Sequence, residues 1–241
     1  MNNKPFIKVP NKFFIIKRNE YKEELNTVFY QIGTEGFTIY CYLLMTQGSQ
    51  LIAQTNIKRI YTFLNSSKKQ KEVIQEHQQN NDKKKEKSLN PKYGLNDYRT
   101  IKKYLTALLK AGLITDQNNS DSYLKTRVDE ELFITVIDNC DELGFSGISS
   151  ELFSDNIKKM GHIGWSIYCL LFQYHNLSFG NQDVGYIGFA NCTEDTMAKI
   201  INKDRRTISE YINKLPKGLI RVERQDGIIK YNPIKDKDEY I

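Results

Sequence analysis

The fold is decided by a stretch that occurs twice in this chain. Residues 36–44 read GFTIYCYLL, and residues 164–172 read GWSIYCLLF, so the numbering offset between the two copies is 128. Upstream of it, residues 6–14 (FIKVPNKFF) match residues 145–153 (FSGISSELF) at an offset of 139. Separate blocks that recur in one order indicate an internal duplication.

A third matching block lies downstream. Residues 97–101 (DYRTI) match residues 204–208 (DRRTI) at an offset of 107, and a Gly-Leu-Ile run follows in each copy. Three blocks in the same order predict two copies of one unit. Because the offset falls from 128 to 107, the first copy carries a net insertion of 21 before this block. We assign the insertion to Ser66–Asn90, a tract so poor in apolar residues that we expect a solvated loop.

The second copy shows the clearer pattern of helices and strands. Apolar residues recur at helical spacing from Ile167 onward. Thr193 and Asp204 are suited to be the N-cap residues of a second and a third helix. Two apolar runs then flank Asp226-Gly227, which is the signal for a β-hairpin with a two-residue turn.

The remaining expected elements follow the same order. A short strand is expected at Tyr186–Phe189 of the second copy. In the first copy we expect helices near Gly36–Met45, Asn56–Asn65 and Asp97–Lys110, and a hairpin over Leu113–Val128.

The order helix, strand, helix, turn, helix, hairpin is that of a winged helix-turn-helix. We therefore predict an α+β fold, mainly α, made of two tandem winged helix-turn-helix domains. The first spans residues 1–130 and carries the polar insertion near residues 66–90, and the second spans residues 145–241. Residues 131–144 are expected to be the linker, and each domain is expected to enclose its own hydrophobic core.

The run from Ile148 to Tyr231 resembles the winged-helix domain at the N-terminus of RepA-type plasmid replication initiators and of DnaD-like replication proteins. The shared features are Ile148-x-x-x-Leu152-Phe153, the helix with Tyr168-Cys169-Leu170-Leu171, the helix start Asp204-Arg205-Arg206-Thr207-Ile208, and Gly218-Leu219-Ile220 before the hairpin. The resemblance extends over both repeats, about three quarters of the chain. It implies DNA binding in replication initiation. The third domain that longer initiators carry has no counterpart in this sequence.

Tandem winged helices of this length also resemble a second class of plasmid initiator, which binds iterated origin repeats. The sequence contains no motif diagnostic of that class.

In a winged helix, the third helix enters the major groove, and its first residues meet base edges. In the second copy, the candidates on the outward face of this helix are Arg205, Arg206, Ser209 and Asn213. The matching face of the first copy offers Tyr98, Arg99, Lys102, Lys103 and Thr106. Hairpin cations contact phosphates. The candidates for this role are Arg221, Arg224 and Lys230 in the second copy, and Lys125 and Arg127 in the first.

The charge distribution agrees with this assignment. The formal net charge of +6 is mild, but Lys199 to Lys235 contains ten Lys or Arg against four Asp or Glu. Val128 to Ile157 contains eight Asp or Glu and no Lys or Arg. Since an acidic block cannot lie against phosphate, we expect it at the junction or on the back of the molecule.

Other classes of function find little support in the sequence. The cysteines and histidines lack the spacing of a metal site, and no phosphate-cradling glycine loop or nucleophile elbow is present. We therefore expect no enzyme activity, no cofactor and no metal. The chain has no apolar run near the ~20 residues of a membrane span and no secretory signal, so we expect a cytoplasmic protein with no membrane partner.

The sequence thus predicts a sequence-specific double-stranded DNA-binding protein that initiates plasmid or phage replication. The partners expected with it are double-stranded DNA, a second copy of the chain on DNA, and other replication proteins. Two alternatives stay open. A transcriptional regulator would use the same winged helices, and the sequence does not separate it from an initiator. A protein-interaction module is disfavoured by the basic third helix.

Overall fold

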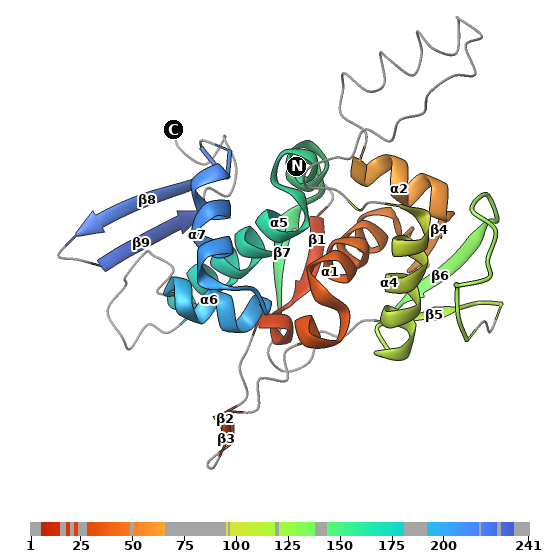
Figure 1. The fold of residues 1–241 in the computed structure, drawn as a ribbon, viewed down its shortest axis with the longest axis horizontal. Coiled ribbons are helices and arrows are strands. Elements are labelled where there is room, and N and C mark those ends of the chain that lie inside the picture. The colour runs from red at the N-terminus through yellow and green to blue at the C-terminus, as the bar shows by residue number, and fades with distance from the viewer. Residues whose placement is uncertain are drawn as a thin grey trace, which may run out of the picture.

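The structure is a computed structural model, and it is α+β and mainly helical (Figure 1). The first repeat contains β1 (Phe6–Pro10), the 3-10 helix η1 (Asn11–Phe14), the short strands β2 (Arg18–Asn19) and β3 (Lys22–Glu23), α1 (Val28–Thr46), β4 (Ile52–Thr55), α2 (Ile57–Asn65), α4 (Tyr98–Lys110), β5 (Ile114–Asp116) and β6 (Leu132–Val136). The second repeat contains β7 (Phe145–Ser149), α5 (Ser150–Gly180), α6 (Glu194–Ile201), α7 (Arg205–Lys214), β8 (Ile220–Gln225) and β9 (Ile228–Pro233).

The structure describes residues 6–14, 18–19, 22–23, 28–48, 51–65, 95, 97–118, 121–137, 144–180, 192–216, 218–225 and 228–233. The expected insertion at residues 66–90 and the expected strand at Tyr186–Phe189 lie outside the described residues.

The central helices α1 and α5 are interrupted at matching positions. Gly33 has φ 64° and ψ 177°, and Gly161 has φ 64° and ψ −178°. The two glycines differ by 128 in residue number, which is also the offset between residues 36–44 and residues 164–172. A backbone with this combination of φ and ψ angles is essentially confined to glycine. The duplication therefore preserves a specific backbone interruption as well as an apolar pattern.

The third helix of each repeat, α4 or α7, packs against the central helix of the same repeat at a glycine. A Cβ atom on Gly36 would lie 3.4 Å from the Tyr104 ring of α4, and one on Gly164 would lie 3.5 Å from the Tyr211 ring of α7. Gly36 and Gly164 match at an offset of 128, and Tyr104 and Tyr211 match at 107. The two third helices are thus held on their central helices by equivalent contacts.

The first repeat contains a three-stranded sheet in the order β4-β6-β5, with both pairs antiparallel. The expected linker at residues 131–144 was wrong in part, because Leu132–Val136 forms the central strand β6 of this sheet. Leu132, Ile134 and Val136 are buried while Phe133 is exposed, so the strand has one core face. The hairpin therefore ends beyond Val128, and a connection over residues 117–131 joins its strands.

The second repeat ends in the antiparallel hairpin β8–β9, in which Gln225 pairs with Ile228. This confirms the two strands expected from the sequence. The turn residues Asp226 and Gly227 lie outside the described residues.

The two repeats join through strands β1 and β7. These strands pair antiparallel, from Phe6 opposite Ser149 to Pro10 opposite Phe145, with Lys8 opposite Gly147 at the centre. Strands β1 and β7 are the matching blocks at an offset of 139. Lys8 therefore faces its own counterpart Gly147, whereas Phe6 faces the counterpart of Pro10 and Pro10 faces the counterpart of Phe6. This is the pairing that a local two-fold axis through Lys8 and Gly147 produces.

A continuous hydrophobic core runs through both repeats. It joins Ile7, Phe37 and Leu105 of the first repeat to Phe153 and Trp165 of the second. Helices α1 and α5 pack against each other, and both pack against the strand pair. The expectation that each repeat encloses its own core was therefore wrong. The apolar faces of the two central helices are complementary, and each covers the other.

Polar contacts also cross between the repeats. The Gln173 side chain donates to the Asn11 carbonyl at 2.8 Å, and the Ser146 hydroxyl donates to the Asn11 side chain at 2.9 Å. Thr34 Oγ1 lies 2.8 Å from His162 Nδ1. Thr34 and His162 are matching positions at an offset of 128, so this contact also lies on the local two-fold axis.

Candidate nucleic-acid interface

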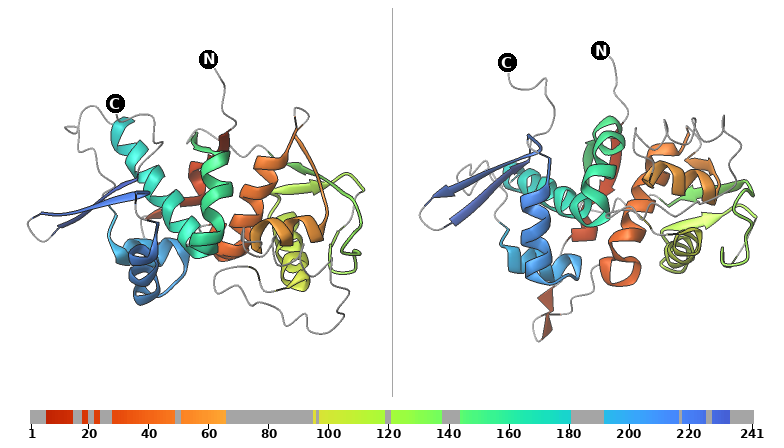
Figure 2. Two further views of the ribbon diagram at one scale, coloured as in Figure 1. Left: turned by 90° about the horizontal axis from the view of Figure 1, so that it is seen from above. Right: turned by 45° about the horizontal axis from the view of Figure 1, so that its top comes forward.

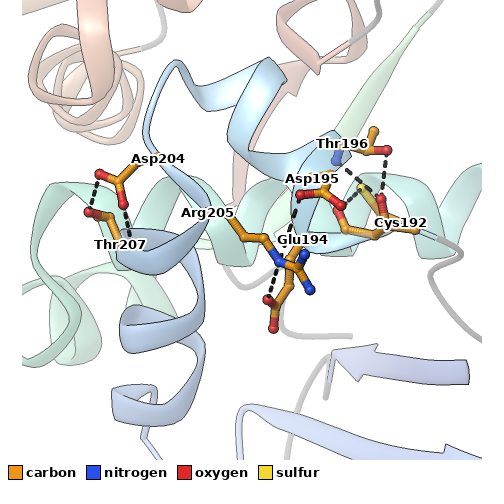
Figure 3. Close-up of polar contacts among 8 residues, drawn as sticks. Cys192, Glu194, Asp195, Thr196, Asp204, Arg205 and Thr207 are labelled. Carbon is orange, nitrogen blue, oxygen red and sulfur yellow. Dashed lines mark hydrogen bonds and ion pairs between the residues drawn. The ribbon is translucent and has the colours of Figure 1, made fainter. Parts of the chain in front are cut away.

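Helix α7 begins at a fully formed N-cap (Figure 3). The Asp204 carboxylate accepts from the Thr207 backbone N–H at 2.8 Å and from the Thr207 hydroxyl at 2.7 Å. These hydrogen bonds, led by the hydroxyl, hold the pKa of Asp204 below its ordinary value. Asn202, in the left-handed conformation with φ 56°, ends α6, so the turn into α7 occupies only residues 202–204. This tight turn fixes the direction of α7.

Arg205 and Arg206 occupy the first turn of α7, as expected. The Arg206 side chain is 89% exposed, and its guanidinium lies 3.4 Å from Glu210 one turn later. The Arg205 side chain is 67% exposed and lies 3.4 Å from Glu194 and 3.7 Å from Asp195 of α6 (Figure 3). The Arg206–Glu210 pair is exposed on both sides and such pairs contribute little, about 0–1 kcal/mol, so Arg206 is available to an incoming anion.

The rest of the α7 face is mixed. Ser209 is half-buried and Asn213 is exposed. Glu210 lies between them and pairs with Lys214 at 3.5 Å. The sequence-based selection of outward residues left this carboxylate out, although helical spacing places it beside Arg206. An acid at this position opposes phosphate and accepts hydrogen bonds, for example from a cytosine amino group.

Helix α4 carries the matching N-cap and a more uniformly basic surface. Asp97 accepts from the Thr100 backbone N–H at 2.6 Å, and this bond lowers the pKa of the Asp97 carboxyl. Arg99 and Lys103 are exposed and Lys102 is half-buried. No acidic residue lies within Tyr98–Lys110, so this helix presents only cations among its charged groups.

Two of the residues expected on the α4 face serve the fold. Tyr98 is half-buried and packs against the Tyr61 ring, with ring centroids 4.8 Å apart. Thr106 is 6% exposed; its hydroxyl donates to the Lys102 carbonyl at 2.8 Å and accepts from the Tyr123 backbone N–H at 3.0 Å. Thr106 therefore fixes the connection between β5 and β6, and the structure places it in the interior and not on the outward face expected for it.

The hairpin cations divide into two groups. Lys125 and Arg127 are exposed but lie in the connection before β6, and Arg127 pairs with Asp129 at 3.3 Å. Arg221 and Arg224 lie on β8, and Lys230 lies on β9, where it pairs with Glu223 in the strand register. The structure thus places all three of the second-repeat cations on the hairpin itself.

Sequence reasoning missed a basic cavity between α2 and α5. Its volume is about 660 Å³, and it is lined by Asn56, Lys58, Arg59, Thr62, Phe63, Ser154, Asp155 and Lys158. Asn56 caps α2 by accepting from the Arg59 backbone N–H at 2.8 Å, and Arg59 pairs with Glu131 at 3.0 Å. No sequence signal joins these residues, because they come from different repeats.

A partly buried polar cluster lies where the repeats meet. The Thr34 hydroxyl, which touches His162, also donates to the Glu35 carboxylate at 3.0 Å. Burial lowers the pKa of His162 more than Glu35 raises it. Burial raises the pKa of Glu35. The opposite effects of His162, a backbone hydrogen bond and Lys203 are together larger, so the pKa of Glu35 lies below its ordinary value. The offset of 128 pairs Thr34 with His162 and is the signal that could have identified this cluster.

Helices α4 and α7 lie toward the same side of the molecule (Figure 2). Arg99 and Lys103 are exposed on α4, and Arg205 and Arg206 are exposed on α7. Among the described residues, no group of three or more His, Cys, Asp or Glu side chains is placed to hold a metal ion. No helix in the described part of the chain is long and apolar enough to cross a membrane.

Comparisons with known proteins found no protein family, no curated protein and no solved structure that matches this chain.

Proposed function

We propose that this chain is a sequence-specific double-stranded DNA-binding protein made of two winged helix-turn-helix units. In the first repeat, the order α1, β4, α2, α4, β5, β6 and the sheet order β4-β6-β5 agree with that architecture. In the second repeat, the tight turn at residues 202–204 between α6 and α7, followed by the β8–β9 hairpin, agrees with it too.

The observation that carries the proposal is the exposed first turn of the third helices. An α-helix fits the major groove of B-DNA, and its N-terminal residues are those that reach base edges. Arg206 in α7 and Arg99 in α4 are equivalent, exposed, and located in this first turn. An Arg side chain binds guanine through two hydrogen bonds, whereas phosphate contacts from the hairpins orient the protein.

Within this class, we assign the protein to replication initiation of a plasmid or phage. This assignment rests on the resemblance of residues 148–231 to RepA-type and DnaD-like winged helices. A transcriptional regulator would use the same helices, so the location of the bound sites is what separates the two roles.

Sequencing of the DNA fragments that the purified protein retains from its source genome and plasmids tests the proposal. The Arg99→Ala/Arg206→Ala double variant is the control, since both side chains are exposed and the fold should survive. Retention of iterated sites at an origin by the parent protein alone supports initiation, and sites that overlap promoters indicate regulation. Equal fragments with both proteins, or none with either, would exclude sequence-specific DNA binding through these helices.

A further inference from the structure

The two-fold relation between the repeats extends from the core to the surface. It is seen in the β1–β7 ladder centred on Lys8 and Gly147, and in the Thr34–His162 contact between matching positions. The same aromatic contact also occurs twice: Phe14 lies 5.6 Å from Phe37, and their counterparts Phe153 and Trp165 lie 4.7 Å apart. The strand ladder and the Thr34–His162 contact therefore lie on one axis, and the aromatic contact shows that the two repeats share the same internal packing.

The third helices follow the same axis. Helix α4 meets α1 through Tyr104 at Gly36, and α7 meets α5 through Tyr211 at Gly164. Because these contacts are equivalent and α1 and α5 are related by the axis, α4 and α7 are related by it too. Figure 1 agrees, since α4 and α7 lie on the two sides of the central helices.

Two helices related by a two-fold axis present the same face to DNA in opposite directions. DNA itself has local two-fold axes, and for this reason two-fold related recognition helices bind inverted half-sites. In most such proteins the symmetry comes from two chains. Here both halves of the symmetric surface lie within one chain.

The two halves differ in the residues that they offer to bases. Helix α7 presents two arginines and an exposed Asn213, which are side chains with directional hydrogen bonds to guanine and adenine. Helix α4 presents one arginine with Lys102 and Lys103, and its Tyr98 and Thr106 are taken up by contacts within the fold. Lys acts more as a point charge than as a base reader, so the α4 half is the less selective one.

We infer that a single chain binds one imperfect inverted repeat, of which the α7 half-site is strictly defined and the α4 half-site is degenerate. This inference rests on the proposed function and specifies its target. It requires a centre-to-centre separation of about one helical turn, or a multiple of it, between the half-sites. It also requires one chain for each complete site.

Selection from a pool of duplexes, randomised over about three helical turns, gives the sequences that the full-length protein prefers. Three synthetic duplexes then follow: the selected half-sites in inverted order, the same half-sites in direct order, and the α7 half-site alone. Affinity is measured by fluorescence anisotropy, and stoichiometry by native mass spectrometry. The inverted duplex should bind at least tenfold more tightly than either of the others, as a complex with one chain.

Variants assign the half-sites. Arg206→Ala should relax selection in the strict half-site, and Arg99→Ala should lower affinity while leaving the strict half-site unchanged. Equal affinity for inverted and direct duplexes, or two chains on one inverted repeat, would overturn the inference while the proposed DNA-binding function stands. Failure to select any sequence would overturn the proposed function itself.

Discussion

Arg206 is the residue on which the proposed base contact depends most. Its side chain is exposed and pairs with Glu210 one turn along the same helix. We predict that Arg206→Ala weakens binding to the preferred duplex by about 5- to 150-fold, since a bidentate contact with guanine is worth about 1–3 kcal/mol. Binding to a scrambled duplex should change much less. Fluorescence anisotropy with both duplexes measures the difference.

The exposed Lys159 of α5 provides the matched control, because it lies outside α4, α7 and both hairpins. Lys159→Ala should leave both affinities nearly unchanged. Equal losses on the two duplexes in Arg206→Ala would instead mean that Arg206 positions the protein on phosphate and does not read sequence.

The Asp204 cap should make folding stability depend on pH. Hydrogen bonds from Thr207 depress the pKa of Asp204 in the folded state. Its contribution to stability is therefore complete above the unfolded pKa of about 3.9 and is lost as the pH falls through the lower folded value. Asp204→Asn keeps a capping oxygen and cannot titrate, so it should reduce the loss of stability between about pH 5 and pH 3, measured by urea unfolding. An identical loss in both proteins would contradict this role.

At the residue scale, the sequence predicted helix caps and exposed cations better than it predicted which side chains contact one another. Thr193 and Asp204 cap their helices as predicted, and Asp97, predicted only as the start of a helix, caps α4 in the same way. Thr106 was misassigned because helical spacing alone does not show which loop will cover a helix face. Its partner Tyr123 comes from the β5–β6 connection, well beyond the end of α4.

At the scale of elements, Gly33 controls the shape of α1. Its φ of 64° with ψ of 177° is essentially accessible only to glycine, so Gly33→Ala should destabilise the fold by about 1–3 kcal/mol. A new Cβ would also lie 3.2 Å from the Glu35 carboxylate. Thermal and urea unfolding measure the effect.

Gly48 is the matched control for this substitution. A Cβ there would meet no atom within 4 Å, and Gly48 has no positive φ. Gly48→Ala should be neutral or slightly stabilising, by up to about 1 kcal/mol. If Gly33→Ala were equally harmless, the interruption of α1 would be an incidental feature of the fold.

Most helices could be predicted at this scale because their caps and apolar spacing are local signals. Strand β6 could not, because the long connection over residues 117–131 separates it from β5 and no short turn signal marks the pair. The alternation of buried Leu132, Ile134 and Val136 was present in the sequence. It was assigned to a linker because the hairpin of the first repeat was expected to end at Val128.

At the scale of the whole molecule, the shared core predicts cooperative unfolding of both repeats together. Phe37 and Trp165 belong to one continuous core, and within the described strands β1 pairs with β7 of the other repeat. Calorimetry should show one transition whose calorimetric and van't Hoff enthalpies agree. Two separable transitions would mean that the repeats fold independently.

The duplication was visible in the sequence, but the joining of the two cores was not. Periodicity shows that a helix such as α1 has an apolar face, yet it does not show which partner covers that face. Only the three-dimensional arrangement reveals that α1 and α5 cover each other. The relation between the two candidate DNA-binding helices depends on this arrangement, so it too lay beyond sequence reasoning.

The central claim is that α4 and α7 bind double-stranded DNA, and a salt titration of the preferred duplex tests it most directly. Each phosphate contact releases counterions, so log affinity should fall linearly with log salt concentration, with a slope of about −0.9 per contact. The parent protein should show a steep slope and the Arg99→Ala/Arg206→Ala variant a weaker affinity at every salt concentration. A flat response in the parent protein, or identical curves for the two proteins, would contradict the claim.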